Sequence, residues 1–151
     1  MSTQSTHSVA HSTFSLERAY AAPPDRVFAA WSDPVVKARW FGGPGVEHQL
    51  EFRVGGRELI RAQTRTGAHV EVESLYRDIV PDRRIVYASL LSADDVLATI
   101  SITTVEIEPD GDGTRLTLTE QGTFLDGHEL PDWRERGTSD WLDALGAELG
   151  S

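Results

Sequence analysis

Most of the chain alternates hydrophobic and polar residues with the period of two that is typical of strands with one buried face. This alternation predicts β-strands over residues 14–20, 46–54, 57–64, 69–80, 84–91, 97–108 and 114–121. Turn-forming sequences separate the later strands, and they include Gly55-Gly56, Thr66-Gly67, Pro81-Asp82-Arg83 and Pro109-Asp110-Gly111-Asp112-Gly113. Strands joined by such short turns indicate an antiparallel meander.

A segment rich in aromatic residues interrupts this pattern between Ala22 and Gly43. Prolines at 23 and 24 suit a first helical turn, and Asp33-Pro34 ends one short helix and begins another. Gly42-Gly43 then predicts a chain reversal into the next strand. The two short helices carry three large aromatic side chains that we expect to form a lid or plug, namely Trp31, Trp40 and Phe41.

The C-terminal segment has a helical period instead. Counted from Trp133, bulky residues recur at multiples of four, with Leu142 beside them and Gly137 interrupting the stripe: Trp133, Trp141, Leu145 and Leu149. One long amphipathic helix covering the apolar face of the sheet gives an α+β fold. The alternative is a helix break, in which residues 137–140 end one helix and cap the next.

Composition narrows the class of protein. The length of 151 residues suits one domain, and we expect residues 1–12, rich in Ser and Thr, to be a disordered tail before a single domain over 13–151. The 14 basic and 24 acidic residues give a net charge of −10, which disfavours nucleic acid and anionic membranes as partners. The chain has no cysteine, no apolar run that could insert into a membrane and no signal-peptide pattern, so a cytoplasmic location is expected.

Three polar residues share faces with apolar ones on the predicted strands, and these are Arg18, His48 and Glu120. A charge at such a position is costly unless it is paired or hydrated. We expect Arg18 and Glu120 to form an ion pair, with a ligand contact as the alternative. His48 is expected at the rim of the sheet, with a role as general base or hydrogen-bond donor in a pocket as the alternative.

A resemblance to a known family covers nearly the whole chain after Ser12. It rests on the order and spacing of Arg18, Ala22-Pro23, Val27-Phe28, Ala30-Trp31, Asp33-Pro34, Arg39-Trp40, residues 53–56, residues 79–86, residues 113–116 and the helix over 137–145. In these features the chain resembles the START-like (SRPBCC, helix-grip) superfamily, in the branch of the activator of the ninety-kilodalton heat-shock protein ATPase. The resemblance implies about seven strands curved around a long C-terminal helix, with a cavity between them.

The superfamily includes carriers of apolar molecules, polyketide cyclases and aromatases, resistance proteins and a co-chaperone domain. From strand parity and this resemblance, the candidate cavity residues are Arg18, Tyr20, Trp31, Trp40, His48, Leu50, Phe52, Val72, Tyr76, Leu118, Glu120, Trp133, Gly137 and Trp141. Nucleophile, phosphate-loop, dinucleotide and metalloprotease motifs are missing, so we predict no metal or cofactor, favour a non-enzymatic protein and assign no catalytic residues.

Three function classes follow. The first is a non-enzymatic binder of a small apolar or aromatic molecule, and the second is a cyclase-like or hydrolase-like enzyme that uses His48, Tyr76, Arg18 or Glu120. The third is a chaperone-interacting stress-response module, and a homodimer is a further expectation. A closed apolar pocket would favour carriage, convergent polar groups would favour catalysis, and a filled interior would favour a protein partner.

Overall fold

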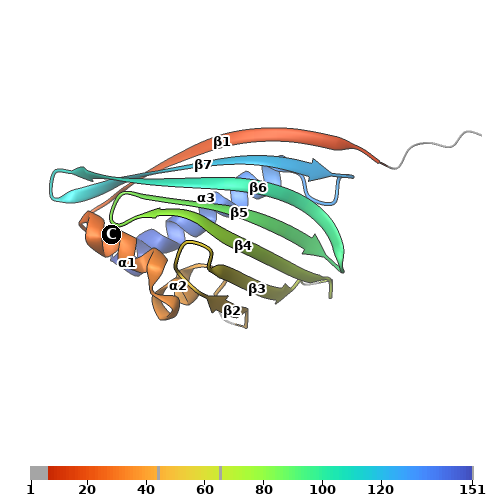
Figure 1. Cartoon of the computed structure of the whole chain (residues 1–151), viewed down its shortest axis with the longest axis horizontal. Helices are drawn as coiled ribbons and strands as arrows, with labels where there is room; N and C mark the ends of the chain where they lie inside the picture. Colours follow the sequence, from red (N-terminus) through yellow and green to blue (C-terminus); the bar gives the residue numbers. More distant parts are fainter. Residues whose placement is uncertain (1–6, 44, 65, 151) are drawn as a thin grey trace, which may run out of the picture.

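The computed structural model describes residues 7–43, 45–64 and 66–150, and in them one curved antiparallel sheet faces a long C-terminal helix (Figure 1). The sheet has seven strands in the order β1-β7-β6-β5-β4-β3-β2. Their bounds are β1 (Val9–Tyr20), β2 (Glu47–Leu50), β3 (Arg57–Gln63), β4 (His69–Val80), β5 (Arg84–Ala93), β6 (Val96–Asp110) and β7 (Gly113–Leu125). Strand β1 pairs with β7, so the first and last strands of the chain are neighbours, and β1 and β2 form the two edges of the sheet. The α+β helix-grip prediction is confirmed.

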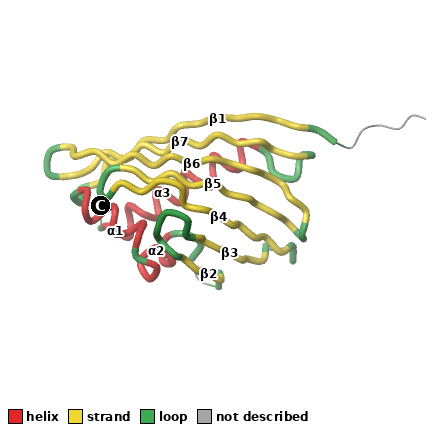
Figure 2. Tube along the Cα trace, viewed as in Figure 1, coloured by secondary structure: helices red, strands yellow, loops and turns green. Residues whose placement is uncertain are grey.

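Helices α1 (Pro24–Ser32), α2 (Pro34–Trp40) and α3 (Pro131–Leu149) lie on one side of the sheet (Figure 2). The break between α1 and α2 falls at Asp33, whose carboxylate accepts hydrogen bonds from the backbone N–H groups of Val35 and Val36 at 2.9 and 3.3 Å. Pro34 follows as the first residue of α2, where its missing N–H has no intrahelical partner to lose. The predicted pair of short helices is therefore confirmed.

Strand β1 begins earlier than the sequence pattern indicates. Val9 to Ser12 pair with the end of β7, and the backbone N–H of Ser8 donates to Asp126 Oδ1 at 2.8 Å. The prediction of a disordered tail is wrong for residues 9–12, because an edge strand can be held by its backbone ladder without burying its side chains. The first six residues of that predicted tail lie outside the described residues.

Strand β2 is shorter than predicted, and the alternation over 46–54 does not continue as one strand. After Leu50 the chain bends, with the backbone N–H of Arg53 donating to the Glu51 carbonyl at 3.1 Å. Gly56 closes this turn at a place where a Cβ atom would collide with the carbonyl oxygen of Glu51. Only a glycine fits so close an approach.

Helix α3 is continuous through Gly137, which confirms the predicted long C-terminal helix and excludes the alternative of a break at residues 137–140. Its buried face differs from the predicted stripe and consists of Thr138, Leu142, Leu145, Gly146 and Leu149. Trp133 is instead 54% exposed. The C-terminal half of α3 thus packs into the core, while its N-terminal half packs less closely against the sheet.

Helix α3 is attached to β1 by hydrogen bonds. Tyr20 donates its hydroxyl hydrogen to the carbonyl of Leu142 at 2.7 Å. Arg18 donates to Asp143 Oδ1 at 3.0 Å and to Ser139 Oγ at 2.7 Å. The predicted ion pair between Arg18 and Glu120 is therefore wrong.

The register of β1 and β7 explains that error. Leu116 lies opposite Arg18, whereas Glu120 lies opposite Phe14. The two charged residues share a face of the sheet, but they stand four residues apart, roughly 13 Å along the strands. The two charged residues thus lie on the same face of the sheet without coming into contact.

Removal of residues 1–12 is expected to destabilise the protein by about 1–2 kcal/mol more than removal of residues 1–6, because the longer deletion takes away the ladder between Val9–Ser12 and β7. Urea unfolding of the two truncated proteins measures the difference. Coinciding midpoints would show that this end of β1 contributes nothing to stability.

Candidate functional site

A cavity of about 310 Å³ lies between the sheet, the N-terminal half of α3 and the loop after α2. Strands β3, β4 and β5 provide most of its apolar wall, and aromatic rings from α3 and the loop complete it. The apolar residues that line it include Phe41, Val46, Ile60, Ala62, Val70, Val72, Leu91, Trp133 and Trp141. Phe41 and Trp141 contact each other with ring centroids 4.2 Å apart.

The floor of the cavity is polar, because two neighbouring rows of residues across the sheet carry hydroxyl or carboxyl groups. In one row Ser74 lies opposite Ser89, and their hydroxyl oxygens are 2.7 Å apart. In the next row Tyr87, Thr103 and Glu120 lie opposite one another on β5, β6 and β7. The antiparallel register therefore gathers these polar groups in one place.

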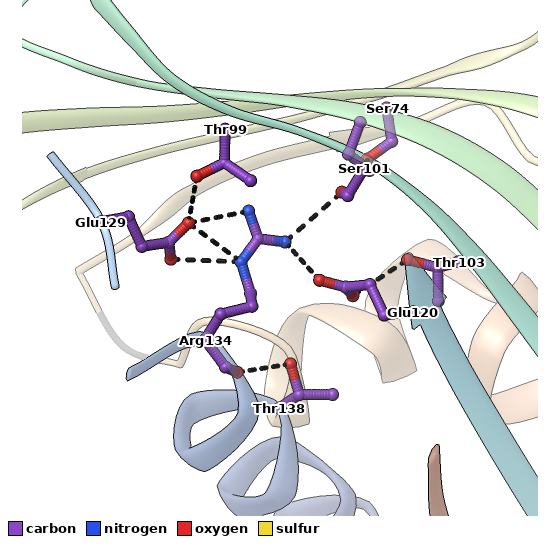
Figure 3. A network of polar contacts seen from close by, with 9 residues as sticks. Ser74, Thr99, Ser101, Thr103, Glu120, Glu129, Arg134 and Thr138 are labelled. Carbon is purple, nitrogen blue, oxygen red and sulfur yellow. Dashed lines mark hydrogen bonds and ion pairs between the residues drawn. The ribbon is translucent and has the colours of Figure 1, made fainter. Parts of the chain in front are cut away.

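The side chain of Arg134 extends from α3 toward the sheet and reaches this polar floor (Figure 3). Its Nη1 donates to Glu120 Oε1 at 2.8 Å, and its Nε donates to the two Glu129 oxygens at 3.2 and 3.1 Å. Arg134 Nη1 also donates to the Ser101 hydroxyl oxygen at 3.5 Å, and the Thr103 hydroxyl donates to Glu120 Oε2 at 3.0 Å. We call Glu120, Glu129 and Arg134 the cavity triad. It connects α3 to β7 through charged hydrogen bonds, which are stronger than neutral ones.

The cavity triad has more carboxylates than cations. One guanidinium faces two carboxyl groups, and the side chains of Arg134 and Glu120 are only 10% and 6% exposed. Burial raises the pKa of Glu120 above its ordinary value of 4.5, although Arg134 and Thr103 oppose this shift. The polar floor of the cavity therefore disfavours additional negative charge.

A second buried cluster lies behind the cavity wall. Lys37 of α2 has its side chain fully buried and donates from Nζ to Glu58 Oε1 at 2.8 Å and to the Tyr76 hydroxyl at 3.1 Å. Tyr76 donates to the same Glu58 oxygen at 3.0 Å, and His48 Nε2 lies 2.7 Å from Glu58 Oε2. Each member of this group, the Lys37 cluster, is thus hydrogen-bonded through Glu58.

Aromatic rings surround the Lys37 ammonium. Its Nζ lies 5.1 Å from the Trp31 centroid, 4.3 Å from Phe41, and 5.8 Å from both Tyr76 and Tyr87. Such contacts attract a cation to the ring faces. Burial alone would raise the pKa of Glu58, but Lys37 and the hydrogen bond with His48 outweigh it and hold that pKa below 4.5. Glu58 therefore serves as the anion of the cluster.

The structure divides the predicted cavity residues among several places. Five of them line the cavity, and these are Val72, Glu120, Trp133, Gly137 and Trp141. His48 and Tyr76 belong to the Lys37 cluster, while Arg18 and Tyr20 hold α3 against β1. The others pack in or against the hydrophobic core, and these are Trp31, Trp40, Leu50, Phe52 and Leu118.

The predicted lid is part of the interior. Trp31 and Trp40 are 1% and 4% exposed, and the indole N–H of Trp40 donates to the Ala30 carbonyl at 3.0 Å. Only Phe41 of the three aromatic residues lines the cavity. The two tryptophans pack behind Phe41, and the ring of Phe41 forms part of the cavity wall.

His48 has a buried side chain, 5% exposed, although the sequence predicted a histidine at the rim. It does not line the cavity, because it faces Glu58 across the β2–β3 pair. The alternative role of His48, as a general base in the pocket, would require a contact with the cavity that His48 does not make.

Sequence reasoning missed four charged residues, namely Lys37, Glu58, Glu129 and Arg134. Glu58 had a usable signal, because it shares its strand face with Ile60 and Ala62. Arg134 also had one, since it stands four residues before Thr138 on the buried side of α3. Lys37 gave no signal, because a lysine on a short helix usually faces solvent.

The described parts of the chain were compared with the requirements of a metal site and of a membrane-spanning helix. Over residues 7–43, 45–64 and 66–150 there is no group of three or more His, Asp or Glu side chains placed to hold a metal ion. Of the helices in these ranges, none has the length and apolar character needed to cross a membrane.

Replacing Lys37 with Met or Glu58 with Leu is expected to cost about 3–5 kcal/mol of stability, because each change leaves a buried charge without its partner. The double variant should lose much less than the sum of the two, as measured by urea unfolding. The exposed pair of Arg61 and Glu71, 2.8 Å apart, is the matched control and should show no coupling. Additive losses at Lys37 and Glu58 would contradict the pairing.

The two buried carboxyl groups are expected to respond oppositely to pH. Folding favours the protonated form of Glu120, so the wild type should gain stability relative to Glu120→Gln as the pH falls from 7 toward 4.5. Folding favours the ionised form of Glu58, so the wild type should lose stability relative to Glu58→Gln as the pH falls below 4.5. Unfolding curves across this range measure both differences, and parallel behaviour of the two variants would refute the assignment.

Comparison with known proteins places the chain in a family. The model of the activator of Hsp90 ATPase homolog 1-like proteins matches residues 21–150. None of the curated proteins compared matches the chain.

Several solved structures are similar to this chain over most of its length. The Mll3558 protein from Rhizobium loti is 47% identical, with a TM-score of 0.88 over 93% of this chain and 99% of its own. An uncharacterized protein from Rhizobium leguminosarum is 37% identical, with a TM-score of 0.92 over 95% and 97%. CalU16 from Micromonospora echinospora, 22% identical with a TM-score of 0.66 over 95% and 85%, shares the fold. Because the family model matches residues 21–150, most of the sequence, the chain belongs to the family of activator of Hsp90 ATPase homolog 1-like proteins.

Proposed function

We propose that this protein binds a small apolar or aromatic molecule in the cavity between the sheet and α3, as a carrier, sequestering protein or sensor. The observation that carries this proposal is the cavity itself, about 310 Å³ in volume with a mainly apolar wall. That volume is at the lower end of the range found for small-molecule sites, roughly 300–1,000 Å³. A filled interior would instead have favoured a function carried by the surface and a chaperone partner.

The aromatic rings around the cavity suit a flat ligand. Phe41 and Trp141 form one side, and the half-exposed ring of Trp133 places an apolar surface where solvent meets the cavity. Aromatic rings stack on or pack edgewise against such side chains with a modest gain beyond the area that they bury. Planar aromatic molecules are therefore the ligands that this wall favours.

Gly137 supports the same interpretation. It lines the cavity in the middle of α3, and a Cβ atom added there would meet nothing within 4 Å. Glycine inside a helix costs up to about 1 kcal/mol relative to alanine. The open space above this position is consistent with room kept for a ligand.

A cyclase-like or hydrolase-like enzyme is the second candidate, favoured by one observation. Glu120 lines the cavity with a pKa raised by burial, and a carboxyl group of this kind can donate a proton. Mass spectrometry of a bound molecule before and after incubation separates the two, because an enzyme changes the mass of its ligand or releases a product, whereas a carrier returns it unchanged.

The neutral dye N-phenyl-1-naphthylamine is expected to bind the purified protein and quench its tryptophan emission, because Trp133 and Trp141 line the cavity. Gly137→Leu should abolish binding while the protein stays folded, since the leucine would occupy the open space. The control is Glu135→Leu, which adds the same side chain at an exposed position of the same helix. Unchanged affinity in a folded Gly137→Leu variant would refute binding at this cavity.

A further inference from the structure

We propose that the cavity selects ligands that place a hydroxyl group against the cavity triad and discriminates against ligands that carry a carboxylate. This inference rests on the proposed function and names the class of ligand. Its basis is the charge and hydrogen-bonding capacity of Glu120, Glu129 and Arg134, which the overall apolar character of the cavity does not predict.

Charge is the first argument. Among the described residues that line the cavity, the charged side chains are the two carboxyl groups and one guanidinium of the triad. A ligand carboxylate would therefore bring a third carboxyl group to a site where two already share one cation, in surroundings that screen charge weakly. The nearby cation of Lys37 does not compensate, because it is hydrogen-bonded to Glu58 and does not line the cavity.

Arg134 is also poorly placed to recognise an acid. Two of its nitrogens already donate to Glu120 and Glu129. Its Nη1 also donates to Ser101 Oγ at 3.5 Å, so two nitrogens could hold a ligand carboxylate together only if Arg134 gave up one of its present hydrogen bonds. The site thus opposes an acidic ligand through both its charge and its existing bonds.

Hydrogen-bonding capacity is the second argument. In Glu120, Oε1 accepts from Arg134 and Oε2 accepts from Thr103, so each oxygen retains an acceptor site. Nη2 of Arg134 is buried and makes no hydrogen bond, although it lies 3.1 Å from Glu129 Oε1. The polar floor therefore has unused hydrogen-bond acceptors on Glu120 and an unused donor on Arg134. A hydroxyl group both donates and accepts, whereas a carboxylate only accepts and a methyl group does neither.

The position of the polar groups orients the ligand. Glu120 and Thr103 share one row of the sheet with Tyr87, and the paired hydroxyl groups of Ser74 and Ser89 form the adjacent row. The apolar residues of β3 and of the outer part of β4 lie beyond these rows. An amphipathic molecule would therefore place its hydroxyl over β6 and β7 and its ring against β3 and β4.

Three probes with the same bicyclic ring test the proposal: 2-methylnaphthalene, 2-naphthylmethanol and 2-naphthoate. Titration calorimetry of the full-length protein at pH 7 should show the alcohol binding tightest and the carboxylate weaker than the alcohol by at least about tenfold. Glu120→Gln should raise the affinity for 2-naphthoate severalfold and leave that for 2-methylnaphthalene unchanged. Glu106→Gln, which removes the same charge from an exposed position of β6, should change none of the three.

The outcomes separate this inference from the proposed function. If 2-naphthoate binds as tightly as 2-naphthylmethanol, or if the alcohol binds no tighter than 2-methylnaphthalene, the selection proposed here is wrong while binding in the cavity stands. If equal gains in 2-naphthoate affinity follow from Glu120→Gln and Glu106→Gln, long-range charge explains the selection and the role of the triad is refuted. If no probe binds and N-phenyl-1-naphthylamine also fails, the proposed function itself fails.

Discussion

The attachment of α3 to the sheet is the constraint on which the cavity depends. The C-terminal half of the helix packs through Leu142, Leu145 and Leu149 into the core. The N-terminal half is connected to β7 through the long side chain of Arg134, which reaches Glu120 at 2.8 Å. Close packing of apolar side chains leaves no space between elements, whereas an arginine bridge spans a gap. One helix thus closes the core at one end and leaves a cavity at the other.

The Lys37 cluster and the cavity share a wall. Phe41 and Tyr87 face the buried ammonium of Lys37, and both residues also line the cavity. The ion pair of Lys37 with Glu58 therefore fixes α2 against β3 and supports the rings that a ligand would contact. A buried pair of this kind adds little net stability compared with an apolar substitute, but it strongly penalises arrangements that separate the two charges. Its role in this protein is consistent with holding the rings in one geometry.

The sequence predicted the fold well, because strand parity and turn chemistry are local. The bounds of β4 match the prediction, and Asp33 separates the two short helices as its capping chemistry requires. The polar site was harder to predict, since it depends on register and on which face of α3 turns inward. The prediction that Glu120 lies on the inner face is correct, but its partner is Arg134 and not Arg18. The residue of β7 that lies opposite Arg18 is Leu116. Parity assigns a face, but it does not tell which residues of neighbouring elements meet.

The excess carboxyl group of the cavity triad connects stability with function. Glu129 by itself would be enough to give Arg134 a buried ionic partner, and it also accepts a hydrogen bond from the Thr99 hydroxyl at 2.6 Å. Glu120 adds a second carboxyl group to the same guanidinium, and burial opposes its ionisation. A group that folding disfavours in its charged form is a poor choice for stability alone, and such groups concentrate at sites with a function. The position of Glu120 on the cavity floor, with an acceptor site free on each oxygen, is consistent with a group kept for a ligand.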